Sequence, residues 1–183
     1  MLSEPDVQGF IRSLRESLEQ SNDSDLFNTI VNAPFNDKIH AVKLDLGIVV
    51  LLLVNEKEDT IDRVALSNTE LAQGAVNVSA KPFHDIKIPL HDVSNIITEA
   101  IMTNKPTKTD DWKYLFTPSL TEDEARMNQA GAGIGCSIVA PFKSKKRTGA
   151  VIFSFFQEPS RITPLHENFI SSYIKEVELR LDV

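Results

Sequence analysis

The last third of the chain has the pattern that most constrains its fold. Residues 137–142 form a short apolar run, residues 143–149 form a basic turn, and residues 150–156 form a second apolar run. Two apolar runs joined by a polar turn that contains glycine predict an antiparallel β-hairpin. The pair Thr163-Pro164 then opens an amphipathic stretch, and proline is well suited to the first turn of a helix. We therefore expect two paired strands followed by one long helix.

The beginning of the chain predicts two helices. Residues 3–18 place apolar side chains at helical spacing, and Ser3 with Asp6 has the pattern of a capping box at the start. Residues 26–31 predict a shorter second helix. We expect it to end before Pro34, because the residue before a proline is biased away from helical backbone.

A long apolar stretch in the first half predicts a strand that is buried on both faces. Residues 40–54 alternate at first and then become continuously apolar, which is typical of a strand covered on both sides. A polar turn leads to residues 60–67, and the two segments predict a hairpin. Residues 68–82 predict a loop with a helical turn. Residues 86–90 predict a third strand, at an edge of the sheet because Pro89 cannot donate a hydrogen bond to a neighbour.

The middle of the chain predicts two more helices around an irregular segment. Asp92 is placed to cap a helix over residues 93–101, and residues 107–120 mix polar and aromatic side chains without a period. Residues 121–124 form a capping box for a helix that reaches Ala130. The resulting order, α-β-β-β-α-α-β-β-α, predicts an α+β domain with helices on the faces of an antiparallel sheet.

Composition argues against several classes of protein. The chain of 183 residues has a formal net charge of −7, which argues against a general nucleic-acid-binding surface. The longest apolar run, residues 47–54, is far shorter than the roughly 18–20 residues that span a bilayer. The chain has one cysteine, which excludes an internal disulfide, and its first residues lack an apolar signal segment. We therefore expect no nucleic acid or membrane partner and a cytoplasmic location.

The residue types that commonly carry catalysis or bind metals are scattered. Cys136 stands in an apolar segment, where a lone cysteine is typically a small buried hydrophobic residue and not a reactive thiol. The histidines are widely separated and lack the spacing of a metal site, which needs three or four converging ligands. A haem held by His84 or His91 stays an open alternative. The histidines are His40, His84, His91 and His166. We predict no catalytic residues and no metal ligands.

One segment combines carboxylates with aromatic rings and is the best candidate for ligand contact. Asp110 and Asp111 precede Trp112 and Tyr114 within the irregular stretch. Carboxylates accept hydrogen bonds from amines and hydroxyls, and aromatic rings offer planar contact surface. The segment therefore predicts a lid over a binding site. The alternative is a solvated loop in which Trp112 closes the edge of the core.

Two further clusters have both an ordinary and a functional interpretation. Gly131, Gly133 and Gly135 lack the spacing of a dinucleotide-binding loop, so we interpret them as a helix end and a hinge for the preceding helix. The basic residues within 143–147 are typical of a solvated hairpin tip, with docking of a phosphate-bearing partner as the alternative.

Several short motifs follow one another from residue 88 onward. They are Ile88-Pro89-Leu90, Asp92-Val93-Ser94, Ile97 with Ala100, Lys105-Pro106 with Asp110 and Asp111, Gly135 to Phe142 with its Ala140-Pro141-Phe142 ending, Gly149-Ala150-Val151-Ile152, and the helix from Thr163. In this order and spacing, residues 25–183 resemble the GAF domain, a small-molecule sensor module. Residues 1–24 then form an N-terminal amphipathic helix within a single domain. The resemblance implies a central antiparallel sheet with the terminal helices on one face. It implies short helices and loops around a ligand pocket on the other.

Departures from GAF subfamilies narrow what the resemblance implies. Asn104-Lys105 is followed by Pro106 and not by the Phe-Asp-Glu of cyclic-nucleotide-binding relatives. Cys136 is followed by Ser137 and not by the histidine of bilin-binding relatives. Methionine-sulfoxide-reducing relatives need several cysteines. The resemblance therefore implies a non-enzymatic sensory or regulatory domain, and we assign it no cofactor.

The function implied is binding of an unidentified small molecule between the sheet and residues 107–135. Signalling would pass through a homodimer of the terminal helices or through a separate signalling protein. The alternatives are an interaction scaffold of the same fold with a filled pocket, a small enzyme with a titratable cluster, and a PAS-like sensor. A cavity of roughly 300 Å³ or more would favour the sensor over the scaffold. The candidate pocket residues are Phe83, Ile97, Ile101, Asp110, Asp111, Trp112, Tyr114, Leu115, Met127, Ile138, Ala140 and Phe153.

Overall fold

The computed structural model describes residues 2–182 and is built on one sheet of six strands in the order β3-β2-β1-β6-β5-β4. Every neighbouring pair is antiparallel. The strands are β1 (Leu46–Asn55), β2 (Thr60–Leu66), β3 (Ile88–Pro89), β4 (Thr107–Thr109), β5 (Cys136–Lys143) and β6 (Thr148–Phe155). Both hairpins, β1–β2 and β5–β6, were predicted from the sequence, as was the edge position of β3.

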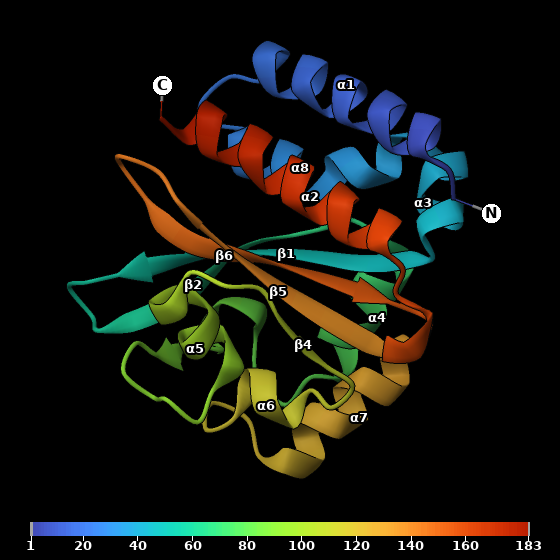
Figure 1. Cartoon of the computed structure of the whole chain (residues 1–183). Helices are drawn as coiled ribbons and strands as arrows, with labels where there is room; N and C mark the ends of the chain where they lie inside the picture. The colour runs from blue at the N-terminus through green and yellow to red at the C-terminus, as the bar shows by residue number, and fades with distance from the viewer. Residues whose placement is uncertain (1, 183) are drawn as a thin grey trace.

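Helices cover both faces of the sheet (Figure 1). They are α1 (Glu4–Gln20), α2 (Leu26–Asn36), α3 (Lys38–Leu44), α4 (Glu70–Val78), α5 (Ile96–Thr103), α6 (Lys113–Phe116), α7 (Glu122–Ala132) and α8 (Pro164–Leu181), with short 3-10 turns η1 (Phe83–Asp85) and η2 (Pro159–Arg161). α2 and α8 pack on one face, and α1 lies outermost, on α8 and α2. α4, α5, α6 and α7 lie on the other face. This arrangement confirms the predicted α+β class.

The two faces of the sheet bury two separate hydrophobic cores. The terminal-helix core lies under α1, α2 and α8, and the short-helix core lies under α4 to α7. The terminal-helix core includes Phe10, Leu51, Phe153, Phe169 and Tyr173. The short-helix core includes Ile48, Val50, Ile97, Leu115 and Ile152. Alternate residues of β1 point into opposite cores, which explains why its sequence is continuously apolar.

The apolar stripe of α1 is buried within the chain. Val7, Phe10, Leu14 and Leu18 are all almost inaccessible to solvent. The Phe10 ring makes an edge-to-face contact with Phe169 of α8, with centroids 4.7 Å apart. This stripe therefore serves the fold of one chain, and it lends no separate support to the predicted homodimer. Within residues 2–182, no helix has the length and apolar character that crossing a bilayer requires.

Three segments differ from the sequence-based expectation. Residues 40–44, predicted as the start of a strand, belong to α3, and β1 begins at Leu46, after Asp45 turns the chain with a left-handed φ of 56°. The predicted loop over 68–82 contains helix α4, because the Thr69 hydroxyl caps it by accepting from the Ala72 amide at 3.2 Å. Part of the predicted irregular segment forms the edge strand β4.

Two helix boundaries also differ from the expectation. α5 is capped by Asn95 and not by Asp92, since the Asn95 side chain accepts from the Ile97 amide at 2.8 Å. α7 runs through Gly131 and ends at Gly133, which has a left-handed φ of 64°. The capping boxes predicted for α1 and α7 are both present.

Pro34 lies inside α2, where the sequence predicted a helix end. A proline in a helix has no N–H to donate to the carbonyl four residues earlier, which here belongs to Ile30. The buried Tyr173 hydroxyl of α8 donates to that same carbonyl. Burial raises the pKa of Tyr173, so the hydroxyl keeps its proton. A tertiary contact therefore replaces the hydrogen bond that proline removes, and the helix continues to Asn36.

Replacing Tyr173 with phenylalanine should destabilise the domain by about 1–3 kcal/mol, because the Ile30 carbonyl then stays buried without a donor. Pro34→Ala restores a helical N–H to that carbonyl, so the cost of Tyr173→Phe should fall in the Pro34→Ala background. Urea unfolding of the four proteins of this double-mutant cycle measures the coupling, which we expect to be about 1 kcal/mol. Strict additivity would contradict the proposed replacement of one donor by the other.

Candidate functional site

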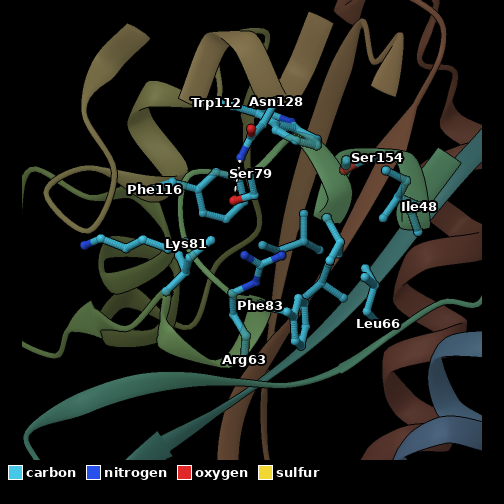
Figure 2. A pocket seen from close by; sticks show the side chains of 16 residues that line it. Ile48, Arg63, Leu66, Ser79, Lys81, Phe83, Trp112, Phe116, Asn128 and Ser154 are labelled. Carbon is cyan, nitrogen blue, oxygen red and sulfur yellow. Dashed lines mark hydrogen bonds between the residues drawn. The ribbon is translucent and has the colours of Figure 1, made fainter. Parts of the chain in front are cut away.

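A small pocket lies between the sheet and the α4, α6 and α7 helices (Figure 2). Its cavity volume is about 30 Å³, and apolar and aromatic side chains form most of its walls. Polar groups reach it from several elements. The lining residues are Ile48, Val50, Arg63, Leu66, Ala72, Ala75, Val76, Ser79, Lys81, Phe83, Ile86, Trp112, Phe116, Asn128, Ile152 and Ser154.

Arg63 of β2 faces this pocket, two residues after the buried Ile61 and directly before a β-bulge. Leu51 pairs with Ala65 and Leu52 pairs with Arg63, so Val64 is an extra residue on β2. An extra residue in one strand shifts the alternation of its side chains between the two faces. Arg63, before the bulge, lies on the pocket side with Leu52, and because of the extra residue Val64 and Ala65 both pack against the terminal-helix core.

The Arg63 guanidinium occupies the pocket without a hydrogen-bond partner for its Nε atom. Its central carbon lies over the Phe83 ring at 4.1 Å from the centroid and over the Phe116 ring at 5.1 Å. Figure 2 shows the side chain extending between these two rings. Burial lowers the pKa of Arg63 to about 9, and within residues 2–182 no carboxylate forms an ion pair with it. Cation–π contacts offset only part of the cost of removing this charge from water.

Other polar groups of the pocket are paired with each other or with their surroundings. Asn128 donates to the Ser79 hydroxyl at 3.2 Å, and Lys81 donates to the Ser119 carbonyl. Ser154 shares a hydrogen bond of 2.7 Å with the buried Ser137. These pairs hold the walls in place and leave Arg63 as the lining side chain with an unsatisfied buried nitrogen.

The overall structure is similar to solved structures of low sequence identity. A GAF domain from an Acinetobacter phosphoenolpyruvate-protein phosphotransferase is 9% identical with a TM-score of 0.65, over 98% of this chain and 94% of that one. A second, from the Coxiella burnetii phosphoenolpyruvate-protein phosphotransferase, is 10% identical with a TM-score of 0.64, over 97% of this chain and 95% of that one. The chain has the GAF fold. This confirms the fold implied by the sequence resemblance, and the PAS alternative is set aside.

An enzyme also shares the GAF fold with this chain. The free methionine-R-sulfoxide reductase of Neisseria meningitidis, solved with its substrate, is 12% identical with a TM-score of 0.62, over 100% of this chain and 93% of that one. No family model and no curated protein matches the sequence. At these identities the likeness establishes the fold alone.

The GAF fold places the predicted pocket residues in three locations. Phe83 and Trp112 line the pocket. Ile97 and Leu115 are buried in the same short-helix core, and Ile101 is half-buried against it, without lining the cavity. Trp112 is held by two hydrogen bonds: its Nε1 donates to the Ser137 hydroxyl at 2.9 Å, and its amide donates to the Gln129 side chain at 2.8 Å. The ring therefore forms a fixed wall of the pocket.

The polar part of the predicted lid faces solvent. Asp110 is exposed, and Tyr114 and Met127 are 45% and 67% exposed. Asp111 accepts from Arg126 at 2.9 Å and from the Lys113 amide at 3.0 Å, so it links α6 to α7. The two carboxylates therefore lie outside the pocket lining.

Three predicted residues point to the opposite face of the sheet. Ile138, Ala140 and Phe153 belong to the terminal-helix core, so the prediction that they line the pocket under the short helices was wrong. Because side chains alternate along a strand, the neighbours Ser137, Val139, Ile152 and Ser154 are the ones that face the short helices. Both faces of β5 and β6 are apolar, so the sequence pattern did not distinguish them.

Arg63 was missed because charged residues near a turn are usually solvated. A signal was present in the sequence, since Arg63 follows Ile61 by two residues and therefore shares its face of the strand. Ile61 is fully buried in the short-helix core. An arginine in phase with a buried isoleucine is directed at the core.

The predicted reactive or metal-binding residues lie apart from one another. Cys136 is buried in the terminal-helix core, and burial raises the pKa of its thiol to about 11. His84 contacts the Arg63 carbonyl at 3.0 Å, His91 pairs with Asp59 at 3.0 Å, and His166 caps α8. The side chain of His40 lies outside the described residues. Across the part of the chain that the structure describes, no three candidate ligands gather at a metal site.

Replacing Arg63 with methionine should raise the free energy of unfolding by about 1–3 kcal/mol at pH 7, because a half-buried cation without an ion pair gives way to an apolar side chain of similar length. Arg161→Met is the matched control, since Arg161 is exposed, and should change stability by less than about 0.5 kcal/mol. Urea unfolding measures both. A loss of stability in Arg63→Met would show that the aromatic contacts outweigh the desolvation of the charge.

The stability gap between the wild type and Arg63→Met should depend on pH. The pKa of Arg63 is about 9 in the folded state, below its ordinary value in the unfolded state, so the unfolded chain keeps this proton to a higher pH. The cost of the charge is present in full below about pH 9 and is relieved as the pH rises above it. Unfolding at pH 7, 9 and 10.5 should show the gap narrowing, whereas a constant gap would place the pKa of Arg63 near its ordinary value.

Proposed function

We propose that this chain is a non-enzymatic sensory or regulatory domain that binds a small molecule in the pocket that contains Arg63. The observation that carries the proposal is the unpartnered guanidinium nitrogen inside an otherwise paired pocket. Buried polar groups in native proteins are nearly always satisfied, so each exception calls for a partner or another specific explanation. A bound ligand would supply the missing partner.

The volume of the cavity limits the size of the ligand that the pocket can hold. About 30 Å³ is roughly a tenth of the volume of a typical small-molecule site, and by itself this favours the scaffold with a filled pocket. A purely structural interior would gain stability from an apolar residue at position 63. The unsatisfied charge therefore supports binding, and the volume limits the ligand to a very small one unless the walls move.

The fold offers a direct path from the pocket to the terminal helices. Ile152 lines the pocket, and the next residue of β6, Phe153, contacts Phe169 and Tyr173 of α8 with ring centroids 5.8 and 5.1 Å apart. A shift of β6 on ligand binding would change how α8 packs. The proposal is that this change in population is read by a second copy of the chain or by a separate signalling protein.

Native mass spectrometry of the purified protein tests the proposed binding. We expect an added mass that is lost on denaturation, and the charge-state series also reports whether the protein is a monomer or a dimer. Ala75→Leu should fill the cavity and abolish the added mass, because Ala75 lines the pocket. Ala130→Leu, at an exposed position of another helix, should retain it.

A clean mass for the wild type and for both variants would favour the scaffold. If Ala75→Leu also raised the free energy of unfolding, the pocket would act as an unfilled part of the core.

A further inference from the structure

The lining of the pocket has positive side chains and no negative side chain to balance them. Arg63 and Lys81 are the charged residues of its lining, and both are cationic. In the part of the chain that the structure describes, no aspartate or glutamate lines the cavity. A site with this balance favours an anionic occupant over a neutral or cationic one.

The aromatic neighbours of Arg63 leave its hydrogen-bonding capacity unused. Phe83 and Phe116 interact with the positive charge through their ring faces. A phenylalanine ring has no in-plane lone pair, so it cannot accept a hydrogen bond from Nε–H in the way that an oxygen does. The guanidinium is therefore positioned by its contacts while a donor remains open.

The volume of the cavity sets the size of the occupant. A water molecule has a share of about 30 Å³ in the liquid and needs about 10–15 Å³ of cavity volume. The observed 30 Å³ accommodates a group of a few heavy atoms. A drug-sized ligand or a nucleotide would need far more space.

The geometry points to a short-chain carboxylate, of the size of formate or acetate, as the ligand of this pocket, with Arg63 as the residue that recognises it. This inference rests on the proposed small-molecule function and names its ligand class. A guanidinium presents its N–H donors in a planar fork that matches the two oxygens of a carboxylate. The apolar walls formed by residues such as Ile48, Val50 and Ile152 suit a methyl group better than a second polar end.

Such a ligand would bind with modest affinity. A ligand of four heavy atoms has a dissociation constant of about 0.04 mM at the most favourable known efficiency per atom. The domain would therefore respond to carboxylate at sub-millimolar to millimolar concentrations.

Titration followed by NMR of the ¹⁵N-labelled protein tests the inference directly. The Nε–H signal of Arg63 reports on the proposed contact and does not depend on a variant that folds. At constant ionic strength, acetate should shift this signal with saturation in the sub-millimolar to millimolar range. Acetamide, its neutral isostere, should bind at least ten-fold more weakly, and benzoate should fail to bind because it exceeds the cavity.

Variants separate recognition by Arg63 from non-specific effects. Arg63→Met should weaken acetate binding at least ten-fold, as monitored on the amide signals of Phe83 and Ser154, which line the same pocket. Arg161→Met removes the same charge from an exposed position and should leave binding unchanged.

The outcomes that overturn the inference also distinguish it from the proposed function. Equal binding of acetamide and acetate with no effect of Arg63→Met would leave a small-molecule site but overturn carboxylate recognition. A chloride titration as effective as acetate would show a site for any small anion and would also overturn the carboxylate assignment. No response to formate or acetate would overturn the inference, and a clean native mass would then remove the proposed function as well.

Discussion

β1 and β6 lie side by side at the centre of the sheet, with apolar side chains on both of their faces. Burying one such side chain stabilises the fold by about 1.5–3 kcal/mol, so leaving either face in water would be costly. The helices on both sides provide that cover. α2 and α8, with α1 outside them, cover the terminal-helix core, and the short helices α4 to α7 cover the other face, where a small cavity remains beside Arg63. The candidate site therefore lies between the sheet and the layer of short helices.

The two faces of the sheet differ in whether their buried polar groups have hydrogen-bond partners. On the terminal-helix side, Pro34 deprives the Ile30 carbonyl of its helical donor, and Tyr173 donates to it from 143 residues further along the chain. On the pocket side, the Nε of Arg63 has no hydrogen-bond partner. Because residues so far apart in the sequence meet to satisfy this carbonyl, the packing on the terminal-helix side is close. The unsatisfied Nε of Arg63 is therefore a local feature, and the proposed ligand would supply its hydrogen-bond partner.

The GAF fold is shared by domains of phosphoenolpyruvate-protein phosphotransferases and by a methionine sulfoxide reductase. Function within this fold therefore depends on the side chains around the pocket and not on the sheet. In this chain those side chains are a cation between two aromatic rings, a fixed tryptophan wall and a cavity of about 30 Å³. They support recognition of a small anion and offer contact, through β6, with α8.

Much of the fold could be predicted from the sequence, because hairpins, capping boxes and amphipathic helices are set by residues close together in the chain. The capping boxes that start α1 and α7 are of this kind. Residues 40–44 were predicted wrongly because five residues are too few to distinguish the alternation of a strand from the spacing of a helix. The residues that line the pocket were harder to predict from the sequence. Ile138, Ala140 and Phe153 were assigned to it although they face the terminal helices, since alternation does not tell one buried face from the other. The sequence by itself determined the elements and their class. Only the tertiary structure decided which face holds the pocket and that the Nε of Arg63 has no hydrogen-bond partner there, because both depend on contacts between segments distant in the chain.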